Sequence, residues 1–268
     1  LDYQAQLNYK LARLSKLIDG GESAGFSPAI IQASATGYRH RARLAYANGE
    51  LGFKAKSSHS IVGVEQCPLL EDAINTALAK SRDPLARYFG QKVSGEVVFS
   101  ADREGRVGIR IQKDGFVDVK RSEQLAQDIG APAFLHSVVG TKGPLWLGAG
   151  ASLSYQVTDS LTLRYQPGDF TQVNTAINRQ IIAQCIAWLA PEADELIADY
   201  FCGLGNFSLA LAQSGAQVMG FDAGAGMIES ANQQALEKSL PATYFCADLF
   251  DPDAITIPAG CRKVVLDP

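Results

Sequence analysis

The chain has 268 residues, of which 47% are hydrophobic and 19% are charged, and its formal net charge at pH 7 is −4. This composition excludes an intrinsically disordered protein, and no stretch approaches the roughly 18 apolar residues that a membrane-spanning helix requires. The negative net charge also excludes nucleic-acid binding over the whole surface, although it leaves room for a local basic patch.

The first residues and the cysteines bear on the compartment. Leu1-Asp2-Tyr3-Gln4 lacks the basic-then-apolar pattern of a secretory signal, so we expect a cytoplasmic protein. The cysteines show no CxxC spacing, which predicts reduced, mostly buried thiols and no metal cluster in this chain. They are Cys67, Cys185, Cys202, Cys246 and Cys261.

The first part of the chain mixes helices with strand pairs. Apolar residues recur at helical spacing from Leu7 to Ile18, which predicts an amphipathic packing helix that ends at Gly20-Gly21. Further patterns predict a hairpin in 41–64 around Asn48-Gly49, a helix in 70–78, paired strands at 97–100 and 107–111, a helix in 122–129, and a hairpin of 153–157 with 161–165. Residues 1–166 are therefore predicted to form an α+β domain.

A different pattern follows Pro167-Gly168, because longer helices alternate there with short apolar strands. The expected order is a helix in 173–188, a strand in 195–201, a helix from about 207, a strand in 217–221, a helix in 225–238, and strands in 243–246 and 263–267. Strict alternation predicts a parallel, doubly wound, Rossmann-like sheet in residues 167–268.

The segment from Asp199 to Phe207, with the sequence DYFCGLGNF, lies where a predicted strand meets a helix. Its glycines allow the backbone to approach a ligand closely, as in nucleotide-binding loops. A dinucleotide site is disfavoured because Ser208 stands where the third glycine would be. Asp199 fits a ligand that carries a positively charged methionine ammonium group instead of a diphosphate.

Two further aspartates follow the next predicted strands. Asp222 is placed to accept hydrogen bonds from both ribose hydroxyls of an adenosine, and a helix N-cap is its alternative role. Asp248 is placed to meet the adenine edge, and a cap or turn is the alternative there. Asn206 could cap the following helix as well as touch the ligand. Together these residues predict a class I methyltransferase site for S-adenosylmethionine.

The sequence resembles the bacterial RNA uracil-C5 methyltransferases, and most closely those that act on large-subunit ribosomal RNA. Asp199 to Phe207 is similar to the cofactor loop of the family, 169–174 (DFTQVN) to its FxQVN motif, and 265–268 (VLDP) to the start of its DPPR motif. Upstream, 38–44 (YRHRARL), 51–54 (LGFK) and 66–70 (QCPLL) resemble its central-domain motifs. The resemblance implies a class I methyltransferase fold, C-terminally incomplete in this chain, behind a central RNA-contacting domain.

The resemblance also implies which residues contact S-adenosylmethionine: Gln172, Phe201, Asn206, Asp222, Asp248 and Asp267. Two of them depart from the pattern of the family, since Asp222 replaces a more frequent glutamate and Asp248 a frequent asparagine. An aspartate at the second position accepts hydrogen bonds but donates none, so Asp248 is the weakest member of this set.

A basic stretch offers candidate RNA contacts. Alternating arginines on a strand point the same way and can hold phosphates. The candidates are Arg39, Arg41, Arg43, Lys54 and Lys56, and a solvated sheet face without RNA is the alternative interpretation.

The mechanism implied by the resemblance needs a cysteine thiolate that attacks C6 of uracil and a carboxylate that removes the C5 proton. In the family both groups follow the DPPR motif, whereas this sequence stops at Asp267-Pro268. We therefore expect no catalytic residue here, and a chain that binds cofactor without forming 5-methyluridine. A non-catalytic truncated protein that binds RNA or cofactor, and a small-molecule methyltransferase, remain as alternatives.

Overall fold

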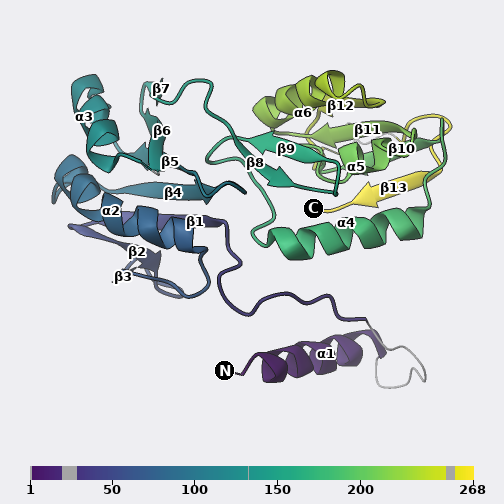
Figure 1. The fold of residues 1–268 in the computed structure, drawn as a ribbon, viewed down its shortest axis with the longest axis horizontal. Coiled ribbons are helices and arrows are strands. Elements are labelled where there is room, and N and C mark those ends of the chain that lie inside the picture. The colour runs from purple at the N-terminus through teal and green to yellow at the C-terminus, as the bar shows by residue number, and fades with distance from the viewer. Residues whose placement is uncertain (1, 20–28, 132, 252–256) are drawn as a thin grey trace.

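The computed structural model describes residues 2–19, 29–131, 133–251 and 257–268. Two units, each built on its own sheet, lie side by side (Figure 1). The first contains β1 (Arg41–Ala47), β2 (Glu50–Lys54), β3 (Ile61–Gly63), α2 (Asp72–Phe89), β4 (Gly95–Ala101), β5 (Val107–Lys113), α3 (Val119–Ile129), β6 (Ala133–Gly140) and β7 (Gly143–Trp146).

The sheet of the first unit has the order β3-β2-β1-β4-β5-β6-β7, and all neighbours are antiparallel except β5 and β6. The turn between β1 and β2 has positive φ at both Asn48 and Gly49, at 53° and 82°. Only a few residue types accept this conformation, which explains the Asn-Gly sequence and confirms the predicted hairpin. Strands β6 and β7 were not predicted.

Helices α2 and α3 cover one face of this sheet. Alternate strand residues such as Leu44, Phe99 and Ile109 are fully buried in one cluster with Ile74 and Leu78 of α2. This burial supplies most of the free energy that holds the unit together. The opposite face carries no helix (Figure 1), and the segment of Pro167 and Gly168 packs against it at Gly108 and Arg110.

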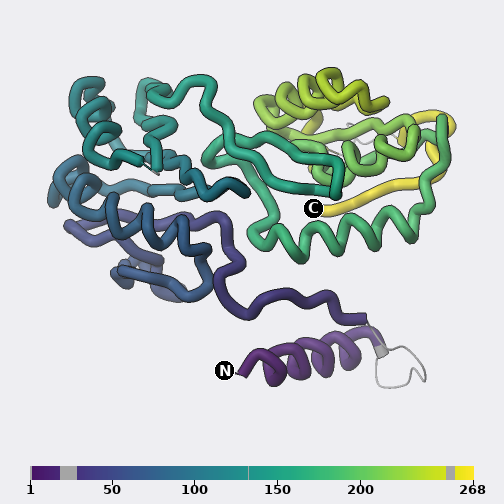
Figure 2. Tube along the Cα trace, in the orientation of Figure 1, coloured from purple at the N-terminus to yellow at the C-terminus, as the bar shows by residue number. Residues whose placement is uncertain are grey.

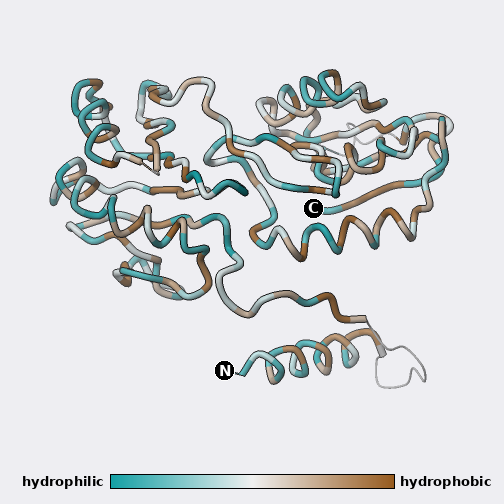
Figure 3. Tube along the Cα trace, in the orientation of Figure 1, coloured by the Kyte–Doolittle hydropathy of each residue, from teal (hydrophilic) through white to brown (hydrophobic). Residues whose placement is uncertain are grey.

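The second unit has a four-stranded sheet in the order β12-β11-β10-β13, and every pair is parallel. This confirms the predicted α/β fold with a parallel sheet. Its elements are α4 (Thr175–Leu189), β10 (Leu196–Tyr200), α5 (Ser208–Ala212), β11 (Gln217–Asp222), α6 (Ala225–Glu237), β12 (Ala242–Cys246) and β13 (Lys263–Leu266). Hydrophobic and hydrophilic segments alternate along α4 (Figure 3), as expected for a helix with one covered side.

The hairpin of β8 (Leu153–Gln156) and β9 (Thr162–Tyr165) packs with the second unit. Leu153 and Leu163 are completely buried in one cluster with Ile182 of α4 and Leu209 of α5. The sequence placed the domain boundary between residues 166 and 167. On the packing of the hairpin, we propose instead that the second unit begins near residue 153.

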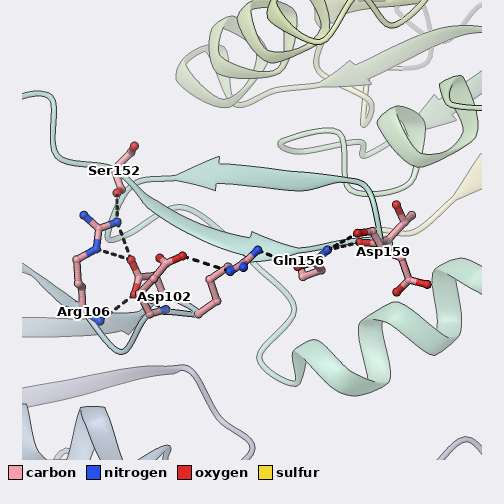
Figure 4. Close-up of polar contacts among 8 residues, drawn as sticks. Asp102, Arg106, Ser152, Gln156 and Asp159 are labelled. Carbon is pink, nitrogen blue, oxygen red and sulfur yellow. Dashed lines mark hydrogen bonds and ion pairs between the residues drawn. The ribbon is translucent and has the colours of Figure 1, made fainter.

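The turn between β4 and β5 reaches across to this hairpin (Figure 4). The buried carboxylate of Asp102 accepts a hydrogen bond from Arg106 Nε at 2.7 Å, and the Arg106 guanidinium also donates to the carbonyl of Ser152 at 3.2 Å. Arg103 donates to the side chain of Gln156 at 2.9 Å. Two neighbouring arginines thus tie the first unit to the hairpin.

Helix α1 (Tyr3–Asp19) lies apart from both sheets, and the chain runs from residue 29 up to β1 (Figure 2). The predicted helix is confirmed, whereas its predicted end at Gly20-Gly21 lies outside the described residues. Leu14 and Leu17 are 43% and 74% exposed, so the expected packing is incomplete. Across the described part of the chain, the helices are too short or too polar to span a membrane.

Gly220 of β11 is tightly enclosed. A Cβ added there would collide with the ring of Tyr244 and would lie 2.9 Å from Sγ of Cys202. A Cβ at Gly205, in the glycine loop, would lie 2.6 Å from the Tyr244 hydroxyl. The two glycines therefore make room for the tyrosine beneath the loop.

We predict that Gly220→Ala lowers the thermal unfolding midpoint by several degrees, because overpacking a filled core costs about 1–3 kcal/mol. The matched control is Gly226→Ala in α6, where an added Cβ meets no atom within 4 Å. Alanine is favoured over glycine in a helix, so the control should keep or raise the midpoint. Equal midpoints for the two variants would contradict the described packing around Tyr244.

Candidate functional site

The carboxyl ends of the parallel strands share one edge of the sheet, and an acidic residue stands at or just after each end. Asp199 lies in β10 and Asp222 closes β11, while Asp248 and Asp267 follow β12 and β13. Burial is the main cause of the raised pKa of Asp199, and the charges of Asp267 and Asp222 add to it. Three of the four carboxylates therefore lie near one another, whereas the convergence of all four on one ligand stays a prediction.

The glycine loop between β10 and α5 is held in a conformation that few residues adopt. Phe201, Gly203 and Gly205 have φ values of 64°, 54° and 87°. A Cβ at Gly203 would meet no atom within 4 Å, so this side of the loop faces open space. The loop thus bends sharply and leaves room beside its backbone for a ligand.

Asp199 stabilises the far end of this loop. Its Oδ2 accepts a hydrogen bond from the backbone amide of Ser208 at 3.1 Å, where α5 begins. The side chain is 1% exposed, and its Oδ1 has no hydrogen-bond partner among the described residues. Burial, together with smaller contributions from the charges of Asp267 and Asp222, raises the pKa of Asp199 to about 7. A buried carboxylate oxygen without a hydrogen-bond partner, such as Asp199 Oδ1, can accept a hydrogen bond from a cationic or hydrogen-donating group of a ligand.

Asp222 links the loop to α6. Its Oδ2 accepts from the amide of Gly203 at 3.0 Å, and its Oδ1 accepts from the amide of Gly224 at 2.8 Å. The N-cap of α6 is Gly224, so Asp222 is not the cap that was the alternative role. Each carboxylate oxygen keeps a second acceptor position, which leaves capacity for ligand hydroxyls.

Asn206 forms a reciprocal amide pair with Asn178 of α4. Each Nδ2 donates to the other Oδ1 at 2.9 Å, and the hydroxyl of Tyr155 also donates to Asn206 Oδ1 at 3.2 Å. The expected helix cap by Asn206 is wrong, because α5 has no side-chain cap and Asp199 takes the amide of Ser208. Asn206 instead fastens the loop to α4 and to the hairpin.

The remaining predicted cofactor contacts are less enclosed. Gln172 Nε2 donates to Asp267 Oδ2 at 3.4 Å, which brings two distant motifs together. The rings of Phe201 and Phe250 lie 5.8 Å apart. Asp248 is exposed and accepts from the amide of Phe250 at 3.0 Å, the contact of a local turn. Asp248 thus takes the turn role, which does not prevent contact with a ligand.

A buried histidine brackets Gln172. His40 Nδ1 donates to the carbonyl of Val173 at 3.1 Å, and Nε2 accepts from the hydroxyl of Thr171 at 3.0 Å. Burial lowers the pKa of His40 to about 4, so the ring is neutral and the carbonyl fixes its tautomer. His40 thus joins the strand extension that carries Arg39 to the segment that carries Gln172.

Sequence reasoning did not single out His40, Tyr155 or Asn178. A signal existed for Asn178, which is a polar residue one turn after Asn174 on the inner side of a helix, and it is 2% exposed. A signal existed for His40 too, because it stands between Arg39 and Arg41 and alternate residues of a strand point to opposite faces. Nothing in the sequence placed Tyr155 opposite the loop, because the hairpin contacts it from 51 residues away.

The predicted basic residues divide into two kinds. Arg41 is half-buried and donates to the carbonyl of Gly168 at 3.3 Å, and Arg39 has a buried Nε without a partner among the described residues. Arg43 is 60% exposed and pairs with Glu96 at 3.3 Å. Lys54 and Lys56 are exposed. Arg43 and the two lysines are thus accessible, whereas Arg39 and Arg41 lie close to the second unit.

The cysteine inside the glycine loop is a poor nucleophile. Cys202 is 5% exposed, and burial together with Asp199 and Asp222 raises the pKa of its thiol. A reactive thiolate needs the opposite environment.

Comparison with known proteins identifies relatives of the chain. The family model for tRNA (Uracil-5-)-methyltransferase matches residues 153–240, beginning at β8. The chain is 37% identical over 243 residues to a 23S rRNA (uracil(1939)-C(5))-methyltransferase of Pseudomonas aeruginosa, covering 87% of this chain and 53% of the relative. It is 32% identical over 281 residues to the enzyme of that name from Shewanella sediminis, covering 100% and 63%.

A solved structure has the same fold. The Pyrococcus abyssi tRNA (uracil-54, C5)-methyltransferase in complex with S-adenosyl-L-homocysteine has a TM-score of 0.74 and 18% identity, covering 100% of this chain and 68% of that chain. The chain spans only 53% of the first curated relative and 63% of the second. Motifs, fold and relatives agree, and the chain is similar to RNA uracil-C5 methyltransferases over most of its own length.

Proposed function

We propose that the protein to which this chain belongs binds S-adenosylmethionine and methylates C5 of a uridine in ribosomal RNA. The observation that carries the proposal is the convergence of Asp199, Asp222 and Asp267 on a glycine loop with open space beside Gly203. The names of the relatives supply the reaction and the RNA.

Each residue of the site has a role in this proposal. The carboxylate of Asp222 accepts the two ribose hydroxyls, and the empty Oδ1 of Asp199 faces the methionine ammonium group. Further contacts come from Gln172, Phe201, Asn206, Asp248 and Asp267. The bound cofactor supplies an electrophilic methyl group on a sulfonium centre. The chain itself orients the cofactor through backbone amides and carboxylates that are already held in place.

The accessible basic residues support RNA binding. Arg43 and Lys54 line one depression on the face of the first sheet that carries no helix, together with Glu96, the ion-pair partner of Arg43, and Asp114. Phosphate groups are attracted to such local positive charge even when the net charge is negative. Arg39, Arg41 and Lys56 complete the proposed set. A small-molecule methyltransferase has no need of this surface.

The nucleophile is proposed to lie outside the five cysteines of this chain. Cys202 is buried, and burial raises the pKa of its thiol. The backbone amide of Cys67 donates to Asn75 Oδ1 at 3.0 Å, and Asn75 Nδ2 donates to the carbonyl of Cys67 at 3.1 Å, so Cys67 has a structural role. We therefore propose that the cofactor and RNA contacts named above bind their ligands without acting as catalytic groups. We also propose that this chain alone does not methylate.

We predict that Asp222→Ala weakens binding of S-adenosylhomocysteine by about 10- to 100-fold, because hydrogen bonds to a charged group contribute about 1.5–3 kcal/mol. Isothermal titration calorimetry measures the change. Glu229→Ala removes an exposed carboxylate from α6 and serves as the control, with unchanged affinity expected. Equal affinities of wild type and Asp222→Ala would refute the proposed site.

We also predict that binding of S-adenosylhomocysteine at pH 7 releases up to about half a proton. Asp199, with a pKa of about 7, is half protonated at that pH, and a nearby ammonium group lowers this pKa. Calorimetry in two buffers of different ionisation enthalpy detects the release. It should vanish at pH 9 and in Asp199→Asn, and a buffer-independent enthalpy in the wild type at pH 7 would rule out the ammonium contact.

A further inference from the structure

A row of side chains crosses five strands on the face of the first sheet that carries no helix. Registers pair Arg43 with Val98, Val98 with Arg110, Arg110 with Ser137, and Ser137 with Trp146. Directly paired residues of neighbouring strands lie on the same face of a sheet. The row therefore extends over about 19 Å, four strand spacings, from the exposed Arg43 to the exposed Trp146, with Arg110 half-buried and Val98 and Ser137 buried between them.

Trp146 is braced although it is exposed. Its side chain is 51% exposed on the edge strand β7, while Leu145 and Leu147 on either side are more covered. The indole meets the buried His136 edge-on with centroids 5.2 Å apart, and Phe134 lies 6.4 Å beyond His136. A large aromatic surface is thus held in a defined position and still open to solvent.

Arg110 connects this aromatic group to the cofactor site. Burial lowers the pKa of His136 and the charge of Arg110 lowers it further, while the same charge partly offsets the burial that raises the pKa of Asp169. The side chain of Arg110 lies against Gly168, where an added Cβ would collide with the guanidinium. Among the described residues Arg110 forms no salt bridge, so its charge is available to a phosphate. Gly168 and Asp169 lead directly to Gln172 of the cofactor site.

We propose that this row binds a single-stranded segment of RNA, with a base stacked on Trp146 and phosphates on Arg110 and Arg43. Single strands are recognised by aromatic side chains that stack bases beside a basic track, whereas a duplex hides its bases. Gly168 meets this row at Arg110, so a strand held between Trp146 and Arg110 lies beside the segment that leads to Gln172. The inference rests on the proposed RNA substrate and adds the strand, its path and the stacking residue.

The chain offers a matched experiment because it has two tryptophans. Trp188 lies on α4 and is 81% exposed, away from the row. Trp188→Phe leaves Trp146 as the only tryptophan, and Trp146→Phe leaves only Trp188, so that excitation at the red edge of the indole band reports one tryptophan at a time. Binding of a fluorescein-labelled single-stranded RNA is followed by anisotropy, and tryptophan emission is followed separately with unlabelled RNA.

In Trp188→Phe, RNA should quench the emission of Trp146 and saturate at the concentration at which anisotropy saturates. RNA should leave the emission of Trp146→Phe unchanged. Trp146→Ala should bind RNA about 10-fold more weakly than wild type, while Trp188→Ala binds as wild type does. Both alanine variants should keep the affinity for S-adenosylhomocysteine, which controls for folding.

Other outcomes would overturn the inference. Anisotropy that shows RNA binding without quenching of Trp146 and without loss in Trp146→Ala would reject the row but leave the proposed function intact. No RNA binding by wild type would reject the proposed RNA substrate along with the row. A concentration-dependent dimer that Trp146→Ala abolishes, without quenching by RNA, would assign this edge of the sheet to self-association.

Discussion

Parallel pairing of β10 with both β11 and β13 is the constraint on which the candidate site depends. It brings the carboxylates of Asp199, Asp222 and Asp267 to one edge of the sheet, where burial disfavours the charged form of Asp199 and the charges of the other two add to this effect. The buried member, Asp199, responds with a pKa of about 7. The fold thus stores an electrostatic cost that a cationic ligand group would relieve, which is the arrangement expected of a binding site.

The two units are coupled by buried contacts that end close to this site. The hydroxyl of Tyr165 donates to the carbonyl of Ala101 at 2.8 Å, and His40 holds the residues on both sides of Gln172. The Arg106 guanidinium adds a hydrogen bond to the carbonyl of Ser152 at 3.2 Å. Because the contacts of Tyr165 and His40 are buried or half-buried, the face with Arg43 and Trp146 keeps a fixed direction relative to the cofactor loop. An RNA strand on that face would therefore be delivered to a defined place.

Periodicity in the sequence correctly predicted the alternating second unit, whereas the ligand site inferred from Asp199, Asp222 and the glycine loop stays a prediction. The sequence pattern did not predict contacts between distant segments. The hairpin 153–165 reads as part of the first unit from its strand pattern, yet its apolar side fits the core of the second. Asn206 looked like a helix cap because of its position, but Asn178 and Tyr155 were in place to engage it. Side-chain partners of this kind depend on the packed fold and leave little trace in local sequence.

A crystal structure with S-adenosylhomocysteine tests the central claim most directly. The account predicts adenosine hydroxyls within hydrogen-bonding distance of Asp222 and the amino group of the ligand beside Asp199, with the ligand backbone passing Gly203. Ligand density at any other place, or a bound ligand that leaves the carboxylates of Asp199 and Asp222 without a contact, would contradict it.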